Sequence, residues 1–206
     1  MKKGRIGVLV SGAGTNLQAI LDACKNPTYP AEIKIVISNI PTAYALERAK
    51  KEKIPALVVP HEKYPSRKDF EMEIVRHLER TGVDLIVLAG FMRILSTDFI
   101  RHFENKIINI HPSLLPSFPG THAIEKAWEY GVKVTGVTVH FVDEGTDTGP
   151  IILQETVGIK EGESLKSLEE RIHAMEHQLY PEAIKLFAQN KLEIRGRKVL
   201  QGGSSL

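Results

Sequence analysis

Five short apolar segments alternate with longer segments of helical spacing in the first half of the chain, and this alternation constrains the fold most. The apolar segments are rich in β-branched residues and predict strands at residues 5–10, 33–38, 56–59, 84–89 and 106–110. Helices are predicted from residue 17 onward, and at residues 41–51 and 67–80. Strands that are apolar on both faces are typical of a mostly parallel sheet with helices on both sides, so we predict an α/β fold.

The pattern changes after residue 122. Residues 132–142 and 150–159 alternate in polarity, which predicts two antiparallel strands added to the parallel sheet and joined by a loop. One long helix follows at residues 164–189, and Ser167 and Glu170 within it have the spacing of a capping box. Because the chain contains no internal repeat or linker, we predict a single domain over residues 1–200 and a disordered tail at 201–206.

The charge balance argues against several classes of partner. The 206 residues include 27 basic and 25 acidic side chains, a formal net charge of +2. Such a balance does not favour a nucleic-acid or membrane surface. The longest apolar run, residues 85–92, is too short to span a membrane. A lone cysteine, Cys24, implies no disulfide framework. We therefore expect a cytoplasmic protein that acts on small molecules, without a nucleic-acid or membrane partner.

A glycine-rich loop, residues 11–16, separates the first predicted strand from the first helix. It resembles a dinucleotide-binding fingerprint but departs from it, because Leu17 stands at the position of the third glycine. The acidic residue that would bind a ribose is also absent, since that position reads Ser38-Asn39. Glycines before a helix still favour an anion, so the loop is either a site for a single phosphate or an ordinary capped turn.

Two polar residues, Asn109 and His111, lie at the carboxyl end of the last predicted parallel strand, where ligands bind in such sheets. They are two residues apart, so both should point to the same face. Taken alone, they favour a structural interpretation, with a buried histidine and a turn-forming asparagine, over a functional site. The loop that follows is stiffened by prolines, as a rigid site requires, at Pro112, Pro116 and Pro119.

The loop between the two antiparallel strands, residues 143–149, contributes carboxylates. One carboxylate beside His111 would raise the pKa of the imidazole and orient its ring. The sequence offers no serine or cysteine nucleophile that is paired with these groups. An amide, an imidazole and a carboxylate suit direct acyl transfer between two substrates, which requires a stabilised oxyanion and the movement of one proton.

Five segments of the chain resemble the phosphoribosylglycinamide formyltransferases, a branch of the folate-dependent formyltransferase family. The segments are "SGAGTNLQAI", "LAGFMRIL", "NIHPSLLPSFPGTH", "VHFVDEGTDTGPII" and "MEHQLYP", and the resemblance covers residues 5 to about 195. It implies a Rossmann-like formyltransferase fold, and formyl transfer from 10-formyltetrahydrofolate to glycinamide ribonucleotide in de novo purine (IMP) synthesis. It also implies no metal and a possible homodimer.

The resemblance assigns roles to particular residues. The catalytic residues would be Asn109, His111 and Asp147, with Asp147 pairing with the histidine and moving the proton through water. Glycinamide ribonucleotide would contact Gly14, Thr15, Asn16 and Glu176. The folate would contact Arg67, Met92, Arg93, Ile94, Leu95, Asn109, Asp143, Glu144, Gly145 and Thr146. His173 stands where the family has a glutamine, and we assign it no role.

Other functions remain open at this point. Methionyl-tRNA formyltransferase and formyltetrahydrofolate hydrolase belong to the same wider family, although the short chain and the glycine loop favour the glycinamide ribonucleotide branch. His173, Glu176 and His177 match the H-x-x-E-H motif of a zinc hydrolase. Helical spacing, however, places Glu176 toward the interior and His177 toward solvent. A phosphate sensor without catalysis would explain the glycine loop but not Asn109 or His111.

Overall fold

The computed structural model describes residues 3–202. The chain divides into two compact units, Met1–Ile108 and Asn109–Leu206. The number of domains stays a prediction.

The first unit is built around a parallel sheet. Its strands are β1 (Gly4–Val10), β2 (Ala31–Ser38), β3 (Ala56–Val58) and β4 (Leu85–Leu88), hydrogen-bonded in the order β3-β2-β1-β4. The helices between them are α1 (Thr15–Lys25), α2 (Tyr44–Lys51), the 3-10 turn η1 (His61–Lys63), α3 (Arg67–Thr81) and α4 (Thr97–His102). The predicted strands and the three predicted helices of this unit are confirmed, whereas α4 was not predicted because it is only six residues long.

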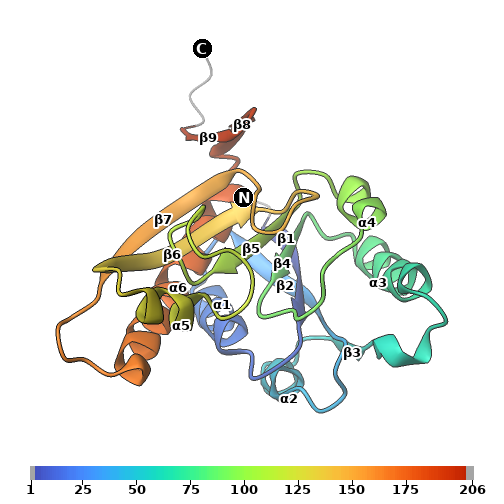
Figure 1. Cartoon of the computed structure of the whole chain (residues 1–206). Helices are drawn as coiled ribbons and strands as arrows, with labels where there is room; N and C mark the ends of the chain where they lie inside the picture. The colour runs from blue at the N-terminus through green and yellow to red at the C-terminus, as the bar shows by residue number, and fades with distance from the viewer. Residues whose placement is uncertain (1–2, 203–206) are drawn as a thin grey trace. The chain divides into compact units, whose positions relative to one another are not determined.

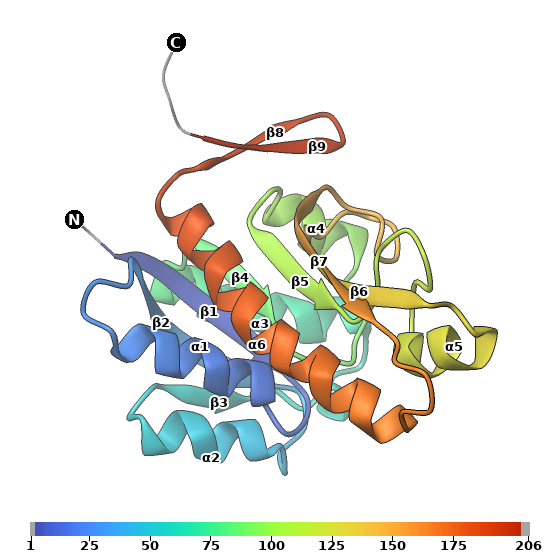
Figure 2. The ribbon, with the colours of Figure 1, turned by 90° about the vertical axis from the view of Figure 1, so that its left-hand side faces the viewer.

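The sequence pattern explains the packing of this unit. All four residues of β4 are buried, as the apolar run predicts for a strand covered on both faces. The buried residues of α3 include Phe70, Ile74 and Leu78, which helical spacing places on one face. Helices α1 and α2 lie next to each other (Figure 2). Burial of each large aliphatic side chain stabilises the fold by roughly 1.5–3 kcal/mol.

The second unit contains an antiparallel pair of strands and a long helix. Its elements are the end of β5 (Ile107–His111), α5 (Ala123–Tyr130), β6 (Val134–Phe141), β7 (Ile151–Gly158), α6 (Leu165–Ala188), β8 (Leu192–Arg195) and β9 (Lys198–Gln201). Strands β6 and β7 pair antiparallel, as predicted (Figure 1). Their register shifts between Val139 and His140. Helix α6 packs against both strands.

The end of the chain differs from its prediction. Strands β8 and β9 form an antiparallel hairpin, and β9 also pairs with β7 at Ile151 and Lys198 (Figure 1). The predicted tail therefore begins too early, because Gln201 is the last residue of β9. Residues 203–206 lie outside the described part of the chain. Helix α5 and the hairpin were not predicted, since both are short. Within residues 3–202, no helix combines the length and apolar character that crossing a membrane requires.

The buried face of α6 is rotated from its predicted position. The helical spacing predicts a buried stripe of Leu165, Leu168, Ile172, Met175 and Leu179. Of these, Leu168 and Ile172 are buried, and the full set of buried residues is Leu168, Ile172, Glu176, Tyr180, Ala183 and Ile184. Glu176 thus lies at the centre of the buried face and is 6% exposed. His177 follows it and is half-buried, so the prediction that it faces solvent is wrong.

The start of α6 gives a test of its capping residue. Ser164 is the N-cap and accepts a hydrogen bond from the backbone N–H of Ser167 at 3.2 Å, so the predicted capping box at Ser167 and Glu170 is wrong. We expect Ser164→Ala to lower the free energy of unfolding by about 1 kcal/mol, because it removes this acceptor. Ser167→Ala is the control and should change it by only a few tenths of a kcal/mol, roughly the helix-propensity difference. Urea denaturation of both variants measures this, and an equal or larger loss for Ser167→Ala would contradict the assignment.

Candidate functional site

The loop of residues 112–120, which we call the proline loop, is fixed by more than its prolines. Thr138 on β6 accepts a hydrogen bond from the N–H of Leu115 at 3.1 Å and donates to the carbonyl of Ser113 at 2.7 Å. The amide of Gln154 on β7 donates to the carbonyl of Leu115 at 2.8 Å. Polar side chains of β6 and β7 therefore hold the loop, which supports the prediction of a rigid segment after His111.

Four polar side chains gather at the end of β5, and we call them the polar cluster. His111 Nδ1 lies 3.4 Å from Asp147 Oδ2, and His140 Nε2 lies 3.6 Å from Asp147 Oδ1. Asn109 Nδ2 lies 3.4 Å from His140 Nε2. The predicted grouping of Asn109, His111 and Asp147 is therefore seen in the structure. His140 was missed, because a histidine in an alternating strand carries no signal of its own.

Asp147 is the centre of the polar cluster. Its side chain is 12% exposed, and its φ of 55° lies in the left-handed region that few residues other than glycine, asparagine and aspartate adopt. The N–H of Gly120 in the proline loop donates to Asp147 Oδ2 at 2.8 Å. Burial raises the pKa of Asp147, but the imidazoles of His140 and His111 and this N–H together lower it below its ordinary value of 3.8. The carboxylate is therefore charged at neutral pH.

His111 is buried, with 5% of its surface exposed, and both of its ring nitrogens face acceptors. Nε2 lies 2.8 Å from the carbonyl of Phe118 and must carry a hydrogen, because a carbonyl oxygen only accepts. Burial is the largest influence on the pKa of His111 and lowers it below 6.5, although the Phe118 carbonyl and Asp147 act in the opposite direction. The prediction that a carboxylate would raise this pKa is therefore wrong in its net direction, since burial outweighs Asp147.

The loop of residues 143–149, which we call the acidic loop, is organised by its own side chains. Asp143 accepts hydrogen bonds from the N–H of Gly145 at 3.2 Å and from the Thr148 hydroxyl at 2.6 Å. Glu144, Gly145 and Thr146 are exposed, as residues that close over a ligand would be. The C-terminal hairpin also supports this loop, because the Arg197 guanidinium donates to the carbonyl of Thr148 at 2.8 Å.

In the first unit, the glycine loop leads directly into α1. Gly14 is the N-cap residue with φ of 69°, and Thr15 and Asn16 are the first residues of the helix. Because a glycine has no side chain to cap the helix, and the first turn has no acidic residue, the helix start favours an anion. Arg48 on α2 donates to the carbonyl of Ala13 at 2.8 Å and braces the loop.

The predicted folate segment, residues 92–95, lies in the same unit. Met92 is 74% and Ile94 76% exposed, which is unusual for apolar residues and fits a surface that a ligand covers. Leu95 is buried, so only its backbone is placed to contact a ligand. Arg67 donates to the carbonyl of Ile94 and pairs with buried Glu71 at 3.1 Å, so its guanidinium is fixed beside the segment.

The glycine loop and the folate segment are linked through one hydroxyl. The N–H of Met92 donates to Ser11 Oγ at 2.8 Å, and Ser11 donates in turn to Asn39 Oδ1 at 2.6 Å. Asn39 is 3% exposed. Asn39 therefore stands where a dinucleotide-binding protein would have its acidic residue, and here it orders the ends of β1, β2 and β4.

The geometry of α6 does not support a zinc site at the H-x-x-E-H motif. Glu176 is buried, His177 is half-buried and His173 is exposed, so the three side chains do not share one face. Among residues 3–202, no three histidine, cysteine, aspartate or glutamate side chains are grouped as a metal site would need.

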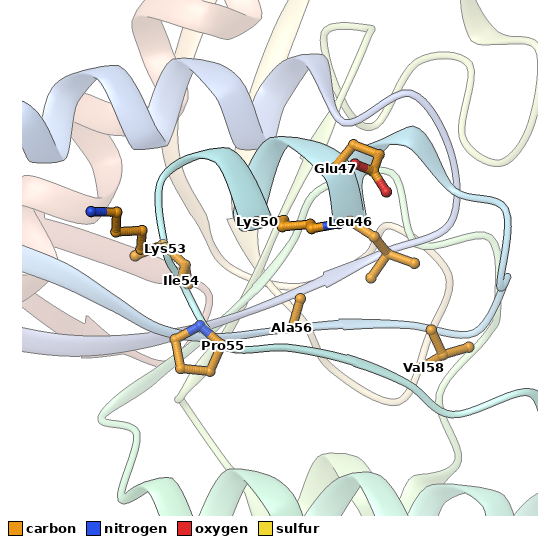
Figure 3. Close-up of a pocket in the computed structure, with 8 residues that line it drawn as sticks. All are labelled: Leu46, Glu47, Lys50, Lys53, Ile54, Pro55, Ala56 and Val58. Carbon is orange, nitrogen blue, oxygen red and sulfur yellow. The ribbon is translucent and has the colours of Figure 1, made fainter.

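A separate hollow lies between α2 and β3 (Figure 3). Its lining includes Lys50, Lys53 and the apolar side chains of Pro55 and Val58. It contains no predicted site residue and no paired donors and acceptors like those of the polar cluster, so we do not assign the chemistry to it.

Known proteins resemble this chain over most of its length. A family model described as "Formyl transferase" matches residues 4–184. The phosphoribosylglycinamide formyltransferase of Bacillus subtilis is 43% identical over 90% of this chain and 94% of its own length. A solved structure titled glycinamide ribonucleotide transformylase 1, from Symbiobacterium toebii, is 51% identical, with a TM-score of 0.94 over 97% of this chain and 94% of that one.

The animal relatives are much longer proteins. The human trifunctional purine biosynthetic protein adenosine-3 is 47% identical over 94% of this chain, but the chain spans only 19% of its length. The structural match covers both units of the chain and confirms the predicted α/β fold with a mostly parallel sheet.

A side chain at Gly14 would collide with α2, and this gives a test of the glycine loop. A Cβ atom there would lie 2.6 Å from the Cβ and 2.9 Å from the Cα of Ala45, and the positive φ adds strain. We expect Gly14→Ala to lower the free energy of unfolding by about 1–3 kcal/mol, measured by urea denaturation. Gly12→Ala is the control, because a Cβ there meets nothing within 4 Å. Equal losses for both variants would refute this account of the loop.

The lowered pKa of His111 predicts a pH-dependent stability. Between that pKa and the ordinary value of 6.5, the unfolded chain binds more protons than the folded protein, so the free energy of unfolding should rise with pH. Asp147 acts in a separate pH window. Its contribution to the free energy of unfolding is present above pH 3.8 and is lost as pH falls through its lower folded pKa.

We expect His111→Gln to flatten the slope of the free energy of unfolding just below pH 6.5, measured by urea denaturation at several pH values. An unchanged slope in His111→Gln would contradict the assignment.

Proposed function

The chain belongs to the formyl transferase family, and from that premise we propose that it transfers a formyl group from 10-formyltetrahydrofolate to the amine of glycinamide ribonucleotide. The products are formylglycinamide ribonucleotide and tetrahydrofolate, a step of de novo purine synthesis. The names of the relatives that match this chain over nearly their full length support this choice of substrates.

The main support for the proposal is the composition of the polar cluster. The cluster contains hydrogen-bond donors and a base, but no serine or cysteine nucleophile paired with them. Ser113 is the hydroxyl residue nearest to His111 in the sequence, but it is fully buried and donates to the carbonyl of Ser117 at 2.5 Å. Cys24 lies on α1 of the other unit, and burial raises the pKa of its thiol to about 11. The cluster therefore suits direct attack of one substrate on the other, without a covalent formyl-enzyme.

In the proposed reaction the glycinamide amine attacks the formyl carbon and forms a tetrahedral intermediate with an oxyanion. The Asn109 amide donates a hydrogen bond to that oxygen. The attacking nitrogen becomes positively charged and loses one proton, which passes through water to the His111–Asp147 pair. The pair then returns the proton to N10 of the folate as the bond from the formyl carbon to N10 breaks. One proton thus moves from the amine to N10, and the reaction is balanced.

The lowered pKa of His111 fits this role. A neutral imidazole at pH 7 can accept a proton, and Asp147 at 3.4 Å stabilises the imidazolium that results. The imidazolium is then a positive charge close to the developing oxyanion. We infer that the charge appears during the reaction, whereas the sequence had suggested a histidine that is already charged.

The remaining site residues keep the roles that the resemblance gives them. The start of α1 with Gly14, Thr15 and Asn16 supports a phosphate contact, and buried Glu176 supports a contact with the glycinamide group. Exposed Met92 and Ile94, the braced Arg67 and the exposed residues of the acidic loop support folate contacts. We further propose a cytoplasmic location and small-molecule partners only. A homodimer stays a prediction.

A single assay separates the candidate functions. Purified protein is incubated with 10-formyltetrahydrofolate and, in parallel, with glycinamide ribonucleotide, methionyl-tRNA or water as the only formyl acceptor. We expect the loss of the formyl folate to require glycinamide ribonucleotide. Transfer to methionyl-tRNA, or loss of the formyl group to water alone at a comparable rate, would instead favour the two related enzymes. Binding of both substrates without turnover would favour a sensor.

Asp147→Asn tests the proton pathway. Asparagine tolerates the left-handed conformation and can still accept from the N–H of Gly120, so the variant removes the charge and preserves the shape. We expect kcat to fall on the order of 100- to 1000-fold while both substrates still bind, because the imidazolium loses its ionic partner. Steady-state kinetics with both substrates measures this.

The matched control is Glu155→Gln, which removes an exposed carboxylate from β7 of the same unit. Its kcat should stay within about twofold of the original protein, since exposed charges on sheet surfaces contribute little. Near-native turnover of Asp147→Asn, or a formylated protein trapped and detected by mass spectrometry, would refute the mechanism.

A further inference from the structure

His140 is a buried group of the polar cluster to which the proposed reaction assigns no step. It lies near the end of β6, and its surface is 2% exposed. The register of β6 and β7 shifts between Val139 and His140. Such irregularities change the direction in which a side chain points. Here the His140 ring lies close to both Asn109 and Asp147.

The hydrogen-bond partners determine which nitrogen of His140 carries the hydrogen. Nδ1 lies 2.8 Å from the carbonyl of Phe141. A carbonyl oxygen only accepts, so Nδ1 is the donor in this contact. In the neutral ring, Nε2 is then an acceptor with a lone pair directed into the cluster.

Of the two described side chains that lie beside Nε2, one can donate to that lone pair. The carboxylate of Asp147, at 3.6 Å, has no hydrogen to give. The Asn109 amide nitrogen, at 3.4 Å, has two.

This contact fixes the direction of the Asn109 amide. If the amide turned over, its oxygen would face the lone pair of Nε2, and the two acceptors would repel each other. With the nitrogen toward His140, one N–H is engaged and the second is left for the formyl oxygen. We propose that His140 is a positioning residue that holds the Asn109 amide with its NH2 group toward the reacting carbonyl. The proposal rests on the proposed function, because it assumes that Asn109 binds the oxyanion.

Two substitutions distinguish the roles of the two ring nitrogens of His140. Asparagine places an amide near the position of Nδ1, so His140→Asn can still donate to Phe141 but offers no acceptor at Nε2. Glutamine reaches the position of Nε2, so His140→Gln can accept from Asn109. We expect His140→Asn to lower kcat about 10- to 100-fold with little change in either KM, because a misplaced group costs rate more than binding. His140→Gln should recover most of the rate.

A double-mutant cycle shows through which residue His140 acts. In an Asn109→Ala background, His140→Asn should lower kcat by less than about twofold, because its target is gone. In an Asp147→Asn background it should retain its full effect. The reverse result, with full loss in the Asn109→Ala background and none in the Asp147→Asn background, would overturn the proposal and assign His140 to the carboxylate.

A second measurement does not depend on activity. The side-chain amide hydrogens of Asn109 should exchange slowly with solvent in the original protein and in His140→Gln, and faster in His140→Asn, as followed by NMR. Equal exchange in all three proteins would overturn the proposal even if formyl transfer is confirmed. Protection that follows the expected order in a protein without formyl transfer would support the positioning role and reject the proposed function.

Discussion

The rest of the site depends on the interactions of the Asp147 carboxylate. It is mostly buried and charged, and it accepts a hydrogen bond from Gly120 while lying beside His111 and His140. A charge in such a place needs partners, because removing the partners of a buried charge typically costs about 3–5 kcal/mol. Two separate stretches of the chain therefore converge on one group: β5 with the proline loop, and β6 with the acidic loop.

Much of the fold could be predicted because it depends on local patterns. The apolar runs of β1 and β4 and the helical face of α3 are visible in the sequence and are confirmed. The short elements α4, α5 and the hairpin were missed, because a few residues give too little periodicity. The start of α6 was predicted correctly, but its capping serine was not, since serine occurs at both Ser164 and Ser167 and only backbone geometry distinguishes them.

The polar cluster was partly predictable for similar reasons. Asn109 and His111 are two residues apart on one strand, and Asp147 lies in an obvious carboxylate-rich loop. His140 could not be found this way, because its contacts depend on a register shift between β6 and β7 that residue spacing does not predict. The direction of the His111 pKa was predicted wrongly, since the sequence shows a carboxylate nearby but not the depth of burial. A sequence shows which residues can carry a charge, but it does not show how far solvent is excluded from them.

The C-terminal hairpin supports the acidic loop from outside the residues that the family model matches. The family model ends at residue 184, yet Arg197 donates to Thr148 beside Asp147, and Gln201 donates to the carbonyl of Ile152 at 3.2 Å. A domain boundary drawn at the end of the family match would therefore cut away support for the acidic loop. A substitution in the hairpin that removes the Arg197 guanidinium would loosen the acidic loop and leave every residue of the polar cluster in place.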